Sequence, residues 1–126
     1  MEKPRIVIVD DNESLLKVLV EFFELQEFNA IGLTSISRIN QLVELEPDLV
    51  ILDYNMPLLN GDQIAELMKE SDRLSATPII MISALLPKNA NILGVAAVLH
   101  KPLDLNSLCE CVARLLKLNE CLFSHT

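Results

Sequence analysis

Three short runs of this chain are apolar at every position, and they restrict the possible folds more than any other feature. They read IVIV at 6–9, LVIL at 49–52 and IIMI at 79–82, and most of their residues are β-branched. β-Branched side chains favour strands, and a strand with one face in water would alternate apolar with polar residues. Runs without alternation therefore predict strands buried on both faces, as in a parallel sheet covered by helices.

Segments with helical spacing separate the predicted strands. The strands are predicted at residues 5–10, 28–34, 48–53 and 77–83, and within 94–101. The helices are predicted from a cap at Asn12 or Ser14 to about Glu27, over a short stretch before Pro47, over 62–71 and after a cap at Asp104. This alternation predicts an α/β fold, a doubly wound parallel sheet with helices on both faces.

The first predicted helix has an apolar face that should point into the core. Its members recur every three or four residues, and they are Leu15, Val18, Leu19, Phe22 and Phe23. At about 100° per residue, Leu16 and Val20 fall beyond this face and should be partly exposed. Two explanations are open for them: packing against the last helix, or an apolar contact for a partner protein.

Size and charge exclude other classes of protein. At 126 residues the chain fits one domain over 1–126, with a core of about 4–118 and a tail at 119–126. It has no apolar run near the roughly 20 residues of a bilayer span and no signal peptide, so we expect a cytoplasmic location. The net charge of −8 argues against nucleic acid or an anionic membrane as a direct partner.

Polar residues follow the predicted strands at the points where the strands end. Asp10 and Asp11 follow the first strand, Asp53 the third, Ser83 the fourth and Lys101 the fifth. Because the carboxyl ends of parallel strands share one edge, where ligands bind, these side chains should meet. Each one alone also fits a turn, a cap or a surface charge, but their joint order favours a functional site.

Three converging carboxylates need a cation, or one of them must take a proton. Oxygen ligands with room for water suit Mg²⁺, with Mn²⁺ as an alternative ion. A carboxylate can act as a nucleophile toward phosphorus, and the transfer then requires neutralisation of the phosphoryl oxygens. A lysine and a hydroxyl beside the metal would supply that neutralisation.

The sequence resembles a known family, the receiver domains of two-component response regulators, and is similar to the chemotaxis regulators among them. The motifs VIVDDNES, PDLVILDYNMP, NG, PIIMISA and HKP occur in the family's order over nearly the whole chain. The resemblance implies a flavodoxin-like (βα)5 fold with strand order 2-1-3-4-5. It also implies a phosphorelay signalling protein that accepts and loses its own phosphoryl group, and not a multiple-turnover enzyme.

The resemblance implies roles for the acidic residues. Asp53 resembles the phosphoacceptor, which takes a phosphoryl group from a phosphohistidine. Asp10 and Asp11 resemble the Mg²⁺-binding acids, with Asp53 and the backbone carbonyl of Asn55 as further ligands. The implied partners are a sensor histidine kinase or histidine phosphotransfer protein, and a downstream target or a covalently linked output domain.

Further roles are implied on the opposite side of the site. Ser83 resembles the switch hydroxyl and Lys101 the phosphoryl-binding lysine, and the peptide bond to Pro102 is usually cis in the family. The residues two past the phosphoacceptor and two past the hydroxyl tune dephosphorylation in the family, and here they are Asn55 and Leu85.

The chain departs from the family pattern in the fourth crossover. A Tyr or Phe usually lies three residues before the lysine, whereas this chain has Val98. The segment between the hydroxyl and the lysine is shorter than usual by about one helical turn, and it contains Pro87, NAN and Gly94. We therefore expect a short or irregular fourth helix, and output through residues 84–93 instead of an aromatic side chain.

Three other functions compete with the signalling switch. An adaptor on the same fold would bind proteins without phosphorylation, and a measurement of Mg²⁺ affinity would distinguish it. A haloacid-dehalogenase-type phosphatase would need an Asp-x-Asp nucleophile, where this chain has Asp10, Asp11 and Asn12. A flavin carrier would need a phosphate loop rich in Ser, Thr and Gly after the first strand, and this chain lacks one.

Overall fold

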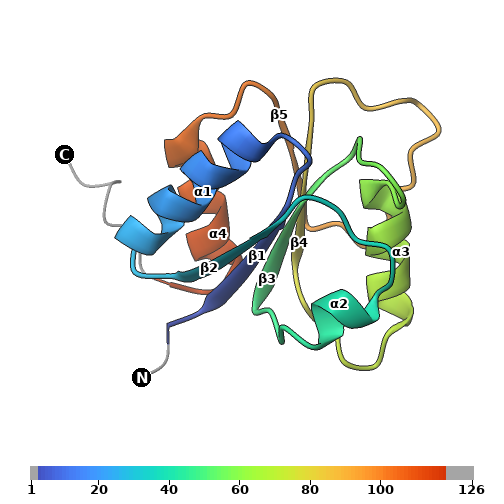
Figure 1. Cartoon of the computed structure of the whole chain (residues 1–126), viewed down its shortest axis with the longest axis horizontal. Coiled ribbons are helices and arrows are strands. Elements are labelled where there is room, and N and C mark those ends of the chain that lie inside the picture. The colour runs from blue at the N-terminus through green and yellow to red at the C-terminus, as the bar shows by residue number, and fades with distance from the viewer. Residues whose placement is uncertain (1–2, 119–126) are drawn as a thin grey trace.

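The strands form one parallel sheet with the order that the family resemblance implies, β2-β1-β3-β4-β5 (Figure 1). The strands are β1 (Arg5–Val9), β2 (Asn29–Leu33), β3 (Leu49–Asp53), β4 (Ile79–Ser83) and β5 (Ala97–His100). The computed structural model describes residues 3–118, so the predicted tail at 119–126 lies outside the described residues. The α/β class and the flavodoxin-like order are confirmed.

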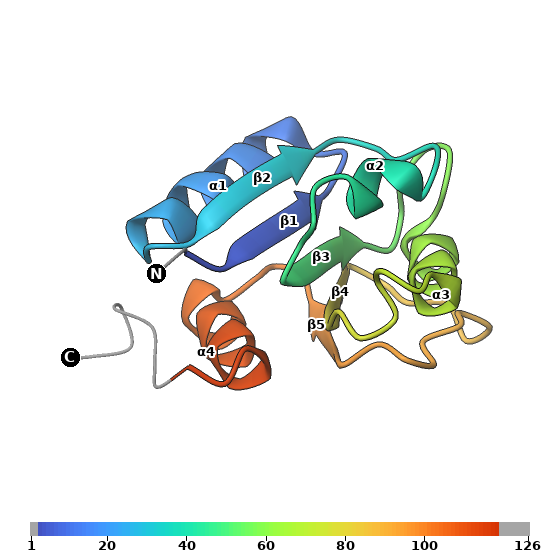
Figure 2. The ribbon, with the colours of Figure 1, turned by 90° about the horizontal axis from the view of Figure 1, so that it is seen from below.

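Helices cover the two faces of the sheet in pairs. They are α1 (Glu13–Leu25), α2 (Asn40–Val43), α3 (Gly61–Glu70) and α4 (Leu105–Leu115). α1 and α4 lie on one face, and α2 and α3 lie on the other (Figure 2). No helix within residues 3–118 is long and apolar enough to cross a membrane.

Polar side chains cap two of these helices at their N-termini. Asn12 Oδ1 accepts a hydrogen bond from the backbone N–H of Leu15 at 3.1 Å, and Asp104 Oδ1 accepts one from that of Asn106 at 3.0 Å. Each cap satisfies a backbone donor that the first helical turn leaves without an intrahelical partner. The caps thereby determine where α1 and α4 leave the loops at the carboxyl edge of the sheet.

The central strands are buried on both faces, as their unbroken apolar runs predict. In β1, Ile6 and Ile8 belong to the apolar cluster beneath α1 and α4, and Val7 and Val9 belong to the cluster beneath α2 and α3. These four side chains are fully buried. At about 25 cal/mol per Å² of apolar surface, such burial is the main source of stability.

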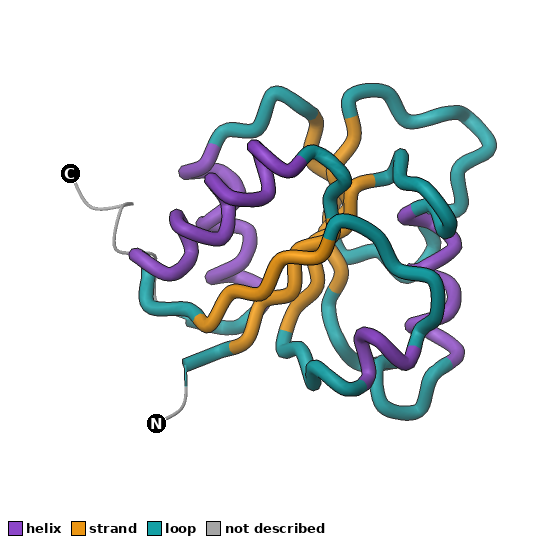
Figure 3. Tube along the Cα trace, viewed as in Figure 1, coloured by secondary structure: helices purple, strands orange, loops and turns teal. Residues whose placement is uncertain are grey.

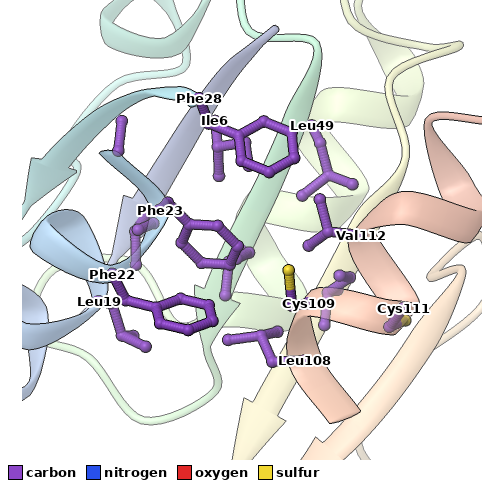
Figure 4. Packing of buried hydrophobic residues seen from close by; sticks show 14 of the residues in the cluster. Ile6, Leu19, Phe22, Phe23, Phe28, Leu49, Leu108, Cys109, Cys111 and Val112 are labelled. Carbon is purple, nitrogen blue, oxygen red and sulfur yellow. The ribbon is translucent and has the colours of Figure 1, made fainter. Parts of the chain in front are cut away.

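Aromatic rings join α1 to the rest of the first cluster (Figure 4). The ring of Phe23 meets that of Phe22 with centroids 5.2 Å apart and that of Phe28 at 5.7 Å, both edge to face. Val112 of α4 is buried in the same cluster. Edge-to-face pairs contribute about 0.5–1.5 kcal/mol beyond the burial of their area.

The predicted apolar face of α1 is wrong at two positions. Leu16, predicted to be partly exposed, is 8% exposed, whereas Val18, predicted to face the core, is 50% exposed. Gly32 in β2 leaves room for Leu16, because a Cβ there would lie 2.9 Å from Leu16 Cγ. Val20 is partly buried.

The connection from β4 to β5 contains turns but no helix, and we refer to residues 84–96 as the β4–β5 segment (Figure 3). This outcome agrees with the expectation of a short or irregular fourth helix. Gly94 has a φ of 81°, in the left-handed region that glycine adopts without strain. Leu86, Ala90 and Val95 are partly buried against the cluster beneath α2 and α3, so irregular chain completes the cover of that face.

Candidate functional site

The polar residues predicted to meet lie together at the carboxyl edge of the sheet. Asp10 directly follows β1, Asp53 is the last residue of β3, Ser83 is the last of β4, and Lys101 directly follows β5. Parallel pairing places the ends of these strands side by side, with Asp53 opposite Ile82. The parallel sheet therefore gathers residues that are far apart in the chain.

Three carboxylates form an acidic cluster at this edge. Asp10, Asp11 and Asp53 each offer an oxygen within 4.8 Å of those of the others. Asp10 is fully buried and Asp53 is 4% exposed, whereas Asp11 is exposed. Burying two like charges is unfavourable, and a hard cation with oxygen ligands would remove the repulsion. The donor set therefore fits Mg²⁺ or Mn²⁺, with the exposed carboxylate leaving room for water.

Lys101 joins the two buried carboxylates. Its Nζ lies 3.2 Å from Asp10 Oδ2 and 3.4 Å from Asp53 Oδ2, and its side chain is 23% exposed. Burial lowers the pKa of Lys101, but the charges of Asp10 and then Asp53 outweigh this effect and raise it above its ordinary value. The ammonium group is therefore charged wherever the carboxylates are.

Asp53 has a pKa above the ordinary value of an aspartate. Burial is the largest cause, and the neighbouring charge of Asp10 adds to it. Lys101 and a hydrogen bond from the backbone of Asn55 act in the opposite direction without cancelling the rise. A raised pKa marks a carboxylate whose negative charge is only partly compensated, which a bound cation would change.

The backbone holds Asp10 at both its main chain and its side chain. Its N–H donates to the carbonyl of Leu33 at 3.0 Å, and its Oδ1 accepts from the N–H of Asn12 at 2.9 Å. Its other carboxylate oxygen, Oδ2, faces Lys101. The orientation of this acid is thus set by β2 and by the start of α1.

Ser83 brings a buried hydroxyl to the end of β4. Its side chain is fully buried, and its Oγ has no hydrogen-bond partner within residues 3–118. Buried hydroxyls without a partner are uncommon because losing water costs free energy that no bond returns. A serine in this state, beside the acidic cluster in sheet order, is suited to bind a polar group that arrives later.

The remaining predicted positions lie around this centre. Asn55 is exposed in the loop after β3, and Val98 is half-buried in β5 against the cluster beneath α2 and α3. Leu85 is 79% exposed, so it does not cover the carboxylates here. The peptide bond between Lys101 and Pro102 is cis.

Sequence reasoning missed the contribution of Gly61. A Cβ on this residue would lie 2.5 Å from the backbone oxygen of Asp53 and 2.9 Å from Tyr54 Cα, and its N–H donates to the carbonyl of Tyr54 at 2.8 Å. The Asn-Gly pair at 60–61 is the start of α3, with Asn60 as its N-cap. The glycine lets α3 approach the backbone of Asp53, the candidate phosphoacceptor. The sequence shows that a glycine is present at position 61, but it does not show that this glycine packs against Asp53.

Tyr54 directly follows Asp53, and its side chain belongs to the cluster beneath α2 and α3. It is 8% exposed, and burial followed by the charge of Asp62 raises the pKa of its phenol above the ordinary value. Asp62 Oδ2 also accepts a hydrogen bond from the backbone N–H of Asn91 at 3.4 Å. This long contact ties the β4–β5 segment to α3.

A comparison with protein families gives one match over most of the chain. The family model described as the response regulator receiver domain matches residues 6–113.

Two curated relatives are larger proteins. The hybrid signal transduction histidine kinase D of Dictyostelium discoideum is 24% identical over 122 residues, which are 94% of this chain and 8% of that protein. A protein-glutamate methylesterase/protein-glutamine glutaminase of Bacillus licheniformis is 29% identical over 91 residues, which are 70% of this chain and 25% of that protein. The chain thus spans a quarter or less of the length of these relatives.

Solved structures share the fold. A response regulator receiver protein from Pseudomonas putida superposes with a TM-score of 0.81 at 25% identity, covering 90% of this chain and 98% of that one. The chemotaxis protein CheY4 of Vibrio cholerae gives 0.80 at 18% identity, with 90% and 98% covered. The receiver domain of sensor histidine kinase PA1611 from Pseudomonas aeruginosa, described with a magnesium ion coordinated in its active site cleft, gives 0.77 at 20%, with 91% and 98% covered.

Proposed function

This chain belongs to the response regulator receiver domain family, and we propose that it is a signalling switch that accepts a phosphoryl group on Asp53. The donor is a phosphohistidine of a sensor histidine kinase or of a histidine phosphotransfer protein. The observation that carries the proposal is the convergence of three carboxylates with the ammonium group of Lys101 at one edge of the sheet.

In the proposed reaction, a carboxylate oxygen of Asp53 forms a bond to phosphorus. The phosphorus–nitrogen bond of the phosphohistidine breaks at the same time, and the imidazole leaves with the electron pair of that bond. Lys101 already lies 3.4 Å from Asp53 Oδ2, so its ammonium group is placed to bind an oxygen of the incoming phosphoryl group. Such transfers depend mainly on positioning and charge neutralisation, which these residues can supply.

Asp10, Asp11 and Asp53, with the backbone carbonyl of Asn55, would hold Mg²⁺ at this site. When bound, the ion supplies positive charge against the phosphoryl oxygens. The buried and exposed members of the acidic cluster have different tasks in this proposal. Asp10, held by the backbone and by Lys101, is a fixed acceptor for a water of the ion, whereas the exposed Asp11 is the closer ligand.

We further propose that the signal leaves the site through residues 84–93 of the β4–β5 segment. The segment lies between Ser83 and Lys101, the two residues proposed to bind the phosphoryl group. It has no helix, and its backbone is tied to α3 through the 3.4 Å contact between Asn91 and Asp62. Val98 has no ring that could move as a switch. A small movement of Ser83 would therefore be transmitted to irregular chain that can change shape.

The direct test is to incubate the protein with Mg²⁺ and acetyl phosphate and to measure its mass. We expect one added phosphoryl group when Mg²⁺ is present, and none when Mg²⁺ is chelated before acetyl phosphate is added. The added mass should be absent in Asp53→Ala and strongly reduced in Asp11→Ala. Asp10→Ala should have a smaller effect if that residue binds the ion through water. Label that persists in Asp53→Ala would contradict the assignment, and an unlabelled protein with no Mg²⁺ affinity would favour an adaptor.

A further inference from the structure

One edge of the sheet is open to a further strand. β2 is the outermost strand, and no strand of the described chain pairs with its outer side. The N–H of Asn29 donates to Pro4 and the carbonyl of Leu33 accepts from Asp10, both toward β1. Since backbone groups of a strand alternate in direction, those of Ala30 and Gly32 point outward.

β2 lacks the features with which proteins usually protect an edge strand. Its sequence is NAIGL, which contains no lysine and no proline, and its pairing with β1 is regular over all five residues. Unprotected edges of this kind pair readily with an extended segment of another chain. The outward N–H groups of β2 can therefore donate hydrogen bonds to an added strand, and its outward carbonyl groups can accept them.

A groove of about 450 Å³ lies along α1 and reaches this edge at Gly32. Its apolar floor consists of Leu16, Val20 and the exposed backbone of Gly32. A Cβ at Gly32 would lie 2.9 Å from Leu16 and 3.1 Å from Val20, so the helix and the strand touch at the floor. The groove thus offers apolar contact directly beside unpaired backbone.

The charged residues at the rim of the groove favour a positively charged partner. Glu13, Glu21 and Glu24 line it against a single basic residue, Lys17. A second copy of this chain would bring the same acidic rim and a formal net charge of −8, and like charges repel. Anionic partners are disfavoured for the same reason, and a basic segment is favoured.

We propose that the groove is a docking site for an extended, basic segment of a partner protein, which adds to β2 as a sixth strand. Side chains of a strand alternate between its faces, so every second residue of the segment would face α1. An apolar residue there would contact Leu16 and Val20, and lysine or arginine two positions to either side would reach the glutamates. None of the residues that line the groove belongs to the acidic cluster, so we expect binding without phosphorylation.

The test uses the ¹⁵N-labelled protein and a capped peptide of sequence Lys-Thr-Val-Thr-Lys. Titration should shift the amide signals of Ala30, Gly32 and the α1 residues of the groove, and the same peptide with Glu in place of Lys should not bind. A peptide N-methylated at its central amides should lose binding, because it cannot donate to the edge. Equal binding by the methylated peptide would overturn strand addition.

Paired charge reversals separate the groove from general attraction to an acidic protein. Glu21→Lys with Glu24→Lys should weaken binding roughly tenfold, on the scale of two exposed ion pairs. Glu66→Lys with Glu70→Lys changes the net charge equally at exposed positions of α3 and should have little effect. Equal weakening by both pairs, or shifts spread over α3, would overturn the proposal. Spectra of the free variants verify that each is folded.

Discussion

The two faces of the sheet are closed in different ways. On one face, α1 with 13 residues and α4 with 11 residues cover a cluster rich in aromatic rings. On the other face, α2 has four residues and α3 has ten, and the helix-free β4–β5 segment completes the cover. The segment leaves Leu85 and Leu93 79% and 84% exposed.

The difference teaches where this domain can change shape. Long helices with buried rings open only with much of the fold, whereas exposed, irregular chain opens locally at low free-energy cost. Ser83 directly precedes the β4–β5 segment, and Lys101 directly follows β5, the strand that begins where the segment ends. We therefore expect the face beneath α1 and α4 to keep its structure, and the other face to change shape in the proposed phosphorylation.

Truncation of one large residue on each face is the strongest test of this comparison. Phe23→Ala removes a fully buried ring and should cost about 3–5 kcal/mol of unfolding free energy. Leu93→Ala changes a side chain that is 84% exposed and should cost less than about 0.5 kcal/mol. Urea unfolding gives both values. A similar cost at the two positions would mean that the β4–β5 segment is as tightly packed as α1.

Two glycines that lie close to other parts of the chain, Gly61 and Gly32, sharpen the comparison at smaller energies. Gly61→Ala places a Cβ 2.5 Å from backbone, which cannot move aside, and should cost about 1–3 kcal/mol while slowing phosphorylation of Asp53. Gly32→Ala meets the ends of the Leu16 and Val20 side chains, which can rotate, and should cost less. Unfolding curves and acetyl phosphate labelling measure the two effects. An equal loss of unfolding free energy in the two variants would show that the backbone around Gly61 moves aside as easily as the side chains around Gly32.

Amide hydrogen exchange should show the two faces responding differently to activation. Addition of beryllofluoride with Mg²⁺ mimics the phosphoryl group, and we expect exchange to change several-fold within residues 84–93. The amides of α1 around Phe23 should remain unchanged, and they serve as the internal control. Changes elsewhere without any in 84–93 would refute the proposed output route, and no change at all would favour the adaptor.

The acidic cluster lies between the two faces of the sheet. The dependence of thermal stability on pH tests how unfavourable the buried charge of Asp53 is when no metal is bound. The folded-state pKa of Asp53 is raised, so its contribution to stability is greatest below the ordinary aspartate pKa and is lost as pH rises through the folded value. Asp53→Asn should therefore raise Tm by a few degrees at pH 7 and by less at pH 4. Thermal unfolding with and without Mg²⁺ measures this. A gain that grows on acidification would contradict the sign, and a wild-type Tm unchanged by excess Mg²⁺ would count against the metal site.

The smallest expected effect concerns the lifetime of the phosphorylated form. Leu85 has no polar group that could position an attacking water, so we expect slow hydrolysis, and Leu85→Glu should speed it a few-fold. Loss of the added mass over time gives the rate. No acceleration in the variant would mean that this leucine, 79% exposed, stays turned away from the site after phosphorylation.

Much of the site could be predicted because its geometry follows from a general property of parallel sheets. Carboxyl ends of neighbouring strands meet, so Asp10, Asp53, Ser83 and Lys101 could be placed together from their positions after apolar runs. The irregular fourth crossover could also be predicted, because Pro87 and Gly94 are local signals of poor helix formation.

The face of α1 could not be obtained from periodicity. Leu16 and Val18 are both apolar and two residues apart, so helical spacing alone allows either to point inward. The choice depends on Gly32, which is distant in the chain and leaves space for Leu16 where another residue would fill it. The same contact creates the groove beside β2.

The sequence by itself determined the buried strands and the polar residues that follow them, because these depend on local apolarity and on which residue comes after each strand. The order of the strands was implied by the resemblance to receiver domains. The tertiary structure alone decided how the edge is held: that Lys101 joins Asp10 to Asp53, and that Gly61 packs against the backbone of Asp53. Contacts of this kind depend on distances of a few ångströms between segments that the sheet brings together. No pattern within one segment contains that information.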